Sequence, residues 1–174
     1  MELRLIQRIV AAAMGTIAAL AGPTARAQET PVDLELVLAI DVSGSMDDDE
    51  RGLQRGGYVA ALRSPQVIAA IGSGVRGRIA LAIVEWAGPS SQSIIVPWRL
   101  IDGRGAAEAA AAELASAPQT RIYGTSISGA LAFSSGLFAA NNFAGDRQVI
   151  DVSGDGANNM GPPVVPVRDL VVAR

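Results

Sequence analysis

The run Ile40-Asp41-Val42-Ser43-Gly44-Ser45-Met46 follows directly on an apolar stretch, residues 34–40, that is typical of a buried strand. Strands of α/β sheets present functional groups at their carboxyl ends, where the chain turns away and short polar side chains can converge. Asp41, Ser43 and Ser45 offer one carboxylate and two hydroxyls there, and Gly44 lets the backbone bend between them. These hard oxygen donors indicate a site for a small divalent cation.

The composition excludes most catalytic chemistries. The 174 residues contain no His, no Cys and no Lys, so all 14 basic residues are arginine. A Ser-His-Asp relay, a thiolate nucleophile, a Schiff base and a phosphate-loop lysine are therefore all impossible. Zinc is disfavoured as well, because the nitrogen and sulfur ligands that it usually takes are absent.

The N-terminus is typical of a secretory signal peptide. Arg4 and Arg8 precede an apolar run, residues 9–20, and Ala25-Arg26-Ala27 has the small-x-small pattern of a cleavage site. Gly22-Pro23 closes the apolar run before it reaches the roughly 18 residues that a membrane span needs. We expect residues 1–27 to be removed after Ala27, and the protein to be periplasmic or secreted with no retained span.

The mature chain, residues 28–174, has the length of one domain and an acidic balance. It keeps 16 acidic and 11 basic residues, a net charge of about −5. Nucleic acid is a poor partner for such a chain, since its phosphates need a basic surface.

Strand and helix patterns alternate along this domain. Acidic residues 47–50 favour a helix start, and Ser64-Pro65 interrupts the helix that follows. The link between the strands predicted at 78–86 and 94–100 is too short for a parallel crossover, so these two should form an antiparallel hairpin at a sheet edge. The remaining predicted elements are helices at 67–71, 103–116, 126–140 and 164–172 and a strand at 147–153.

The strand at 147–153 ends in a sequence close to that of the first strand, Ile150-Asp151-Val152-Ser153-Gly154-Asp155. If the two strands are neighbours, their carboxyl ends open on one crevice. Asp151 aligns with Asp41, but Asp155, followed by Gly156, is better placed to reach across. We favour Asp155 as the carboxylate at the metal and regard Asp151 as a supporting or structural group.

These motifs together resemble the metal-ion-dependent adhesion site of von Willebrand factor type A domains. The resemblance rests on Asp41-x-Ser43-x-Ser45, then Gly124-Thr125 opening a helix, then Asp155-Gly156 after a hydrophobic strand. It covers residues 32–159, and within the family the chain is most similar to an exported bacterial branch of uncharacterised function. The fold that it implies is an α/β, Rossmann-like doubly wound, mostly parallel sheet with one antiparallel edge strand and helices on both faces.

The resemblance also implies ligands and an activity. Ser43, Ser45 and Thr125 would give hydroxyl oxygens to the metal, and Asp41 and Asp155 would act largely through bound waters. The sixth position would go to a carboxylate of a partner protein, and the activity would be adhesion or complex assembly, without turnover. Mg²⁺ or Mn²⁺ suits such a shell better than Ca²⁺, which usually takes more carboxylates.

Two alternatives remain open from the sequence. In a Mg²⁺-dependent phosphatase of the haloacid dehalogenase type, Asp41 would be the nucleophile, and Thr125 or Ser126 would bind phosphate. Against it, Ser43 stands where that mechanism needs a second Asp, and Arg121 is a poor replacement for its Lys. The other alternative is a structural domain that binds no metal.

Domains of the type A family continue through at least two more strand and helix units, whereas only residues 157–174 follow the last predicted strand. We therefore expect a fold that is incomplete at its C-terminus. On the crevice loop, Asn158 and Asn159 are candidates for contact with a partner.

Overall fold

The computed structural model describes residues 29–173. The predicted signal peptide and its cleavage site lie outside this range. No helix among the described residues is both long enough and apolar enough to span a bilayer.

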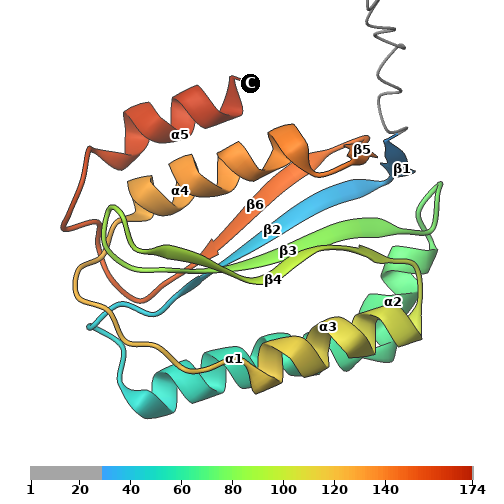
Figure 1. The fold of residues 1–174 in the computed structure, drawn as a ribbon, viewed down its shortest axis with the longest axis horizontal. Coiled ribbons are helices and arrows are strands. Elements are labelled where there is room, and N and C mark those ends of the chain that lie inside the picture. Colours follow the sequence, from blue (N-terminus) through green and yellow to red (C-terminus); the bar gives the residue numbers. More distant parts are fainter. Residues whose placement is uncertain (1–28, 174) are drawn as a thin grey trace, which may run out of the picture.

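A four-stranded sheet forms the centre of the molecule (Figure 1). Its strand order is β4-β3-β2-β6, with β2 at Leu34–Asp41, β3 at Ile79–Trp86, β4 at Gln92–Ile101 and β6 at Gln148–Ser153. Strands β3, β2 and β6 are parallel, and β4 pairs antiparallel with β3. The predicted hairpin is confirmed. The first and last predicted strands are neighbours, which was the condition for a shared crevice, and the carboxyl ends of β2 and β6 lie side by side.

The central strands are apolar because helices cover both faces of the sheet. Alternate residues of β2 enter different cores: Leu38 and Ile40 pack towards α1 and α3, while Val37 and Ala39 face the side of α4. All eight residues of β3 are buried.

One face of the sheet carries α1 (Asp48–Arg63), α2 (Pro65–Gly72) and α3 (Arg104–Ser116), as Figure 1 shows. The acidic start of α1 is a capping box, in which Asp47 accepts from the N–H of Glu50 and Glu50 accepts from the N–H of Asp47, each at 2.8 Å. A proline at the first position of α2 separates the two helices, as the sequence predicted.

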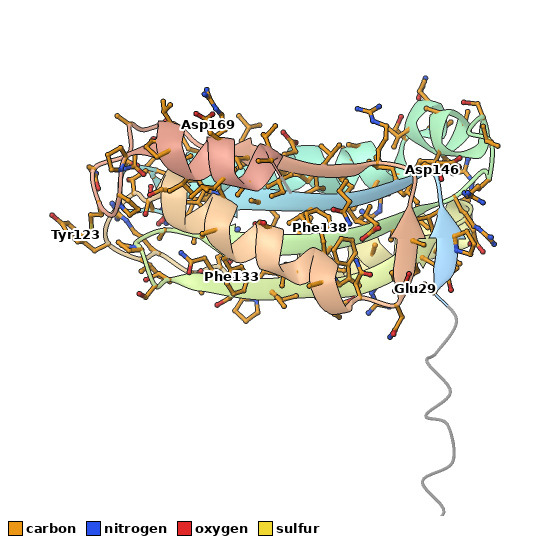
Figure 2. All side chains as sticks on the ribbon, turned by 90° about the horizontal axis from the view of Figure 1, so that it is seen from above. Glu29, Tyr123, Phe133, Phe138, Asp146 and Asp169 are labelled. Atoms are coloured by element: carbon orange, nitrogen blue, oxygen red, sulfur yellow. The ribbon has the colours of Figure 1, made fainter. Side chains whose placement is uncertain are left out.

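The other face carries α4 (Ile127–Gly136) and α5 (Val164–Val172), which lie next to each other above the sheet (Figures 1 and 2). The sequence predicted a single helix over 126–140. In the structure α4 ends at Gly136, and a 3₁₀ turn, η2 (Leu137–Ala140), follows it.

A second, two-stranded sheet, which the sequence did not predict, is made by β1 (Thr30–Val32) and β5 (Phe143–Gly145). Three residues are too few to show a strand period. Buried Glu35 organises this region: it accepts a 2.7 Å hydrogen bond from the N–H of Gly145 and another from the side-chain amide of Asn141.

Candidate metal centre

Three chain segments meet at one end of the sheet, on the left in Figure 1: the loop after β2, the loop after β6, and residues 117–126 between α3 and α4. The third segment docks on the first through an isolated parallel bridge between Ser43 and Ile122, in which the N–H of Ile122 donates to the carbonyl of Val42 at 3.1 Å. Residues 79 positions apart are thereby brought together.

A chain of hydrogen bonds joins the two strand ends. The hydroxyl oxygens of Ser43 and Ser45 lie 2.7 Å apart, and Ser45 Oγ donates to Asp155 Oδ1 at 2.8 Å. Ser43 is fully buried, whereas Ser45 and Asp155 are exposed. We name this set of side-chain oxygens the well; the exposed Ser45 and Asp155 form its outer end, called its mouth.

Asp41 lies at the bottom of the well with one oxygen unsatisfied. Its Oδ1 accepts the N–H of Ser43 at 2.7 Å, but its buried Oδ2 has no hydrogen-bond partner. Burial raises the pKa of Asp41; hydrogen bonds from Ser43 and the nearby backbone N–H of Asp155 oppose this shift, and the charge of Asp155 adds to it. A buried acceptor without a partner is costly to a folded protein and points to a group that completes the site.

Residue 154 is glycine because its backbone lies close to the side chains of Asp41 and Trp86. A Cβ atom at this position would lie 2.7 Å from Asp41 Oδ2 and 3.1 Å from the ring of Trp86. The ring itself is fully buried, and its indole N–H donates to the carbonyl of Ala39 at 3.1 Å. Trp86 is therefore a fixed apolar wall beside the carboxylate.

Thr125 reaches the well from the start of α4. Gly124 precedes it with φ +92°, a conformation that favours glycine, and Ser126 caps the helix by accepting from the N–H of Gly129 at 3.1 Å. The side chain of Thr125 is almost fully buried. A Cβ atom on Gly156 would lie 3.8 Å from Thr125 Oγ1 and 3.5 Å from Ser45 Oγ, so both hydroxyls border the same small space.

The two aspartates of the last strand lie in different places. Asp155 takes part in the hydrogen-bond chain, while Asp151 sits within β6 beside Leu38, exposed and before the end of the strand. Asp151 is thus separate from the other candidate residues.

The two asparagines have internal hydrogen bonds that the sequence did not reveal. Asn159 Oδ1 accepts the N–H of Thr125 at 2.9 Å, and Asn158 Oδ1 accepts the N–H of Ser128 at 3.2 Å. Both side chains tie the loop after β6 to the start of α4. Their position after Asp155-Gly156 was the only signal for this role.

The five predicted residues suit a small hard cation. They are Asp41, Ser43, Ser45, Thr125 and Asp155. In the part of the chain that the structure describes, no three His, Cys, Asp or Glu side chains gather as a metal cluster. A cation here would therefore rely on hydroxyl oxygens beside two carboxylates, a donor set that Mg²⁺ and Mn²⁺ accept. A cation bound by these residues would give the unpaired Oδ2 of Asp41 a partner.

The same geometry is unfavourable for a phosphatase. A nucleophilic carboxylate must reach the phosphorus atom, but Asp41 is fully buried, with Gly154 and Trp86 beside its free oxygen. Arg121, considered as a phosphate ligand, donates to the carbonyl of Gly44 at 2.8 Å.

The family model described as "Protein of unknown function (DUF1194)" matches residues 31–174. No curated protein matches the chain.

Two solved structures illustrate the likeness of fold. The pilus adhesin SpaC from Lactobacillus rhamnosus GG is 21% identical, with a TM-score of 0.53 over 74% of this chain and 16% of the adhesin. Proximal thread matrix protein 1 from the mussel byssus, described with a zinc-occupied MIDAS motif, is 15% identical, with a TM-score of 0.60 over 83% of this chain and 36% of that protein. The chain thus spans a small part of each. At these identities the likeness establishes the fold, and the predicted fold class, a von Willebrand factor A-like α/β sheet, is confirmed.

Proposed function

The chain belongs to the family described as "Protein of unknown function (DUF1194)", and we propose that it is a divalent-metal-dependent protein-binding domain whose cation holds an acidic side chain of another protein. The observation that carries the proposal is the buried, unpaired Oδ2 of Asp41, whose other oxygen binds the N–H of Ser43 at one end of the Ser43–Ser45–Asp155 hydrogen-bond chain.

Each residue has a defined part in this proposal. The hydroxyls of Ser43, Ser45 and Thr125 bind the cation, and the carboxylates of Asp41 and Asp155 balance its charge, largely through water. When it binds, the cation replaces the hydrogen bonds that these oxygens make with one another. It supplies a Lewis-acidic position for an incoming carboxylate, and no bond is made or broken.

Mg²⁺ or Mn²⁺ is the proposed cation. Both are hard enough for hydroxyl and carboxylate ligands, and a shell with two carboxylates leaves the ion electrophilic towards a third. The mussel protein is described with zinc in its motif, so Zn²⁺ belongs among the ions tested, although this chain has no His or Cys to favour it.

We further propose that the protein acts after export, in the periplasm or outside the cell, following cleavage near Ala27. The sequence pattern of residues 1–27 supports this placement.

Calorimetric titration of MgCl₂, MnCl₂ and ZnCl₂ tests the metal site. The wild type should bind one ion, and the Ser43→Ala/Ser45→Ala double variant should give only the heat of dilution. A Ser73→Ala/Ser90→Ala variant is the matched control, because both serines lie outside the three segments that form the well. Equal heats from wild type and the Ser43→Ala/Ser45→Ala variant would remove the proposal.

A further inference from the structure

The segment that carries Thr125 also presents two exposed side chains beside the well. Arg121 and Tyr123 are exposed, while Ile122 between them is half-buried and bridges to the loop after β2. Tyr123 is 85% exposed and projects from the end of the molecule in Figure 2. Exposed aromatic and arginine side chains in one place are typical of binding surfaces.

Arg121 is fixed directly against the site. Its Nη2 donates to the carbonyl of Gly44 at 2.8 Å, and Gly44 stands between the two serines of the well. The other guanidinium nitrogens keep their donors, since a guanidinium has five N–H groups.

The charge of Arg121 has no counter-ion in the described part of the chain. Six other arginines, Arg51, Arg55, Arg63, Arg76, Arg99 and Arg168, each have a carboxylate within 4 Å, and Arg121 has none. Its partner Gly44 is followed along the chain by Ser45, which donates to Asp155, and by the acidic residues 47–50 at the start of α1. The positive charge of Arg121 therefore reduces the repulsion that these carboxylates would exert on an acidic partner.

The segment is held at its start by a buried ion pair. Arg55 binds Glu85 and the carbonyl of Ala117, and Thr120 Oγ1 donates to Glu85 Oε2 at 2.8 Å. Glu85 is 3% exposed, so these bonds lie away from competing water.

The far end of the segment is held as well. The N–H of Ser126 donates to the carbonyl of Ala87 at 2.7 Å, and the N–H of Thr125 donates to Asn159 at 2.9 Å. Arg121 is thus preorganised between two fixed points, which lowers the entropy lost when a ligand binds.

We propose that Arg121 is a second anchor for the partner, so that the recognised segment carries two neighbouring carboxylates, one for the cation and one for the guanidinium. This inference rests on the proposed function, because it needs a cation in the well. Arg121 forms charge-assisted hydrogen bonds with the second carboxylate, and the ring of Tyr123 provides apolar contact next to them.

Blocked peptides measure the effect of the second carboxylate. Two fluorescent pentapeptides, one with a single aspartate and one with two aspartates separated by glycine, are titrated with protein in excess MgCl₂. The wild type should bind the two-acid peptide about tenfold more tightly than the one-acid peptide, the size of one charge-assisted hydrogen bond. Arg121→Gln should abolish that preference and leave calorimetric Mg²⁺ binding unchanged.

A charge swap separates recognition from loop structure. Arg121→Glu should prefer a peptide in which the second aspartate is replaced by lysine. A variant that only loosened the loop would show no such preference. Arg104→Gln is the matched control, because Arg104 begins α3, after β4, at the opposite end of the sheet. Arg104→Gln should bind both peptides as the wild type does.

Two results would overturn this inference. They are equal affinity of the wild type for both peptides and an unchanged preference in Arg121→Gln. Absence of Mg²⁺ binding by the wild type would instead overturn the proposed function, so the two failures are distinguishable.

Discussion

The hydroxyl of Ser45 donates a 2.8 Å hydrogen bond to the carboxylate of Asp155, across 110 positions of sequence. It closes the gap between the carboxyl ends of β2 and β6, which lie side by side in the sheet. Because the bond is exposed, its contribution to stability is small; its value lies in placing a hydroxyl and a carboxylate at the mouth of one well.

Replacement of Asp41 by Asn should separate metal binding from stability. The substitution removes a buried charge that Asp155 opposes and keeps an acceptor for the N–H of Ser43, so the metal-free variant should be at least as stable as the wild type. Excess Mg²⁺ should stabilise only the wild type, by about 2.7 kcal/mol at a hundredfold excess over Kd. Urea unfolding with and without MgCl₂ measures both effects, and Mg²⁺ stabilisation of the variant would contradict the assignment of Asp41.

Gly154→Ala should distort the well, because the added methyl group would lie too close to neighbouring atoms. The new methyl group would meet Asp41 Oδ2 and the fixed ring of Trp86, at a cost of about 1–3 kcal/mol. Mg²⁺ affinity should fall with stability. Gly52→Ala is the matched control, since nothing lies within 4 Å of a Cβ there and a helical alanine should stabilise by roughly 0.5–1 kcal/mol. Equal stabilities of the two variants would refute the close approach.

The buried pair of Arg55 and Glu85 should be among the costliest to break. Arg55→Met leaves Glu85 buried without its counter-ion and should lower the free energy of unfolding by about 3–5 kcal/mol. In the exposed pair of Arg63 with Glu108, Arg63→Met should cost less than about 1 kcal/mol. Chemical denaturation of both variants provides the comparison, and similar losses would argue against the structural role of the buried pair.

Asp33 should make stability depend on pH in the acid range. The backbone N–H of Arg76, at 2.8 Å, and that of Arg78, at 3.2 Å, hold the pKa of Asp33 below its ordinary value of 3.8. A lowered folded-state pKa gives stability that is present above the unfolded pKa and is lost as pH falls through the folded one. The stability advantage of wild type over Asp33→Asn should therefore shrink below about pH 4. An advantage independent of pH between 6 and 3 would contradict this linkage.

Most of the architecture could be predicted because long strands and helices leave a periodic pattern. The strand at Leu34–Asp41 and the hairpin partner of Ile79–Trp86 are examples, whereas the adjacency of β2 and β6 was a condition that only the structure could supply. The β1 and β5 strands could not be predicted, because three residues carry no period and their support comes from the distant side chain of Glu35.

The candidate site was predicted from residues whose types are chemically distinctive. The pattern of Asp41, Ser43 and Ser45 is visible in the chain, whereas the roles of Trp86 and Asn159 depend on tertiary contacts. Arg121 was noticed only as a possible phosphate ligand, because nothing in the sequence shows that it bonds to Gly44.

The central claim is that oxygens from both strand ends hold one cation, and Mn²⁺ calorimetry on two aspartate variants tests it most directly. Asp155→Ala removes the carboxylate at the mouth of the well, while Asp151→Ala removes an exposed carboxylate of β6, the strand that precedes Asp155. We predict that Asp151→Ala binds one Mn²⁺ as the wild type does and that Asp155→Ala loses most of this binding. Undiminished binding by Asp155→Ala, or no binding by the wild type, would contradict the account.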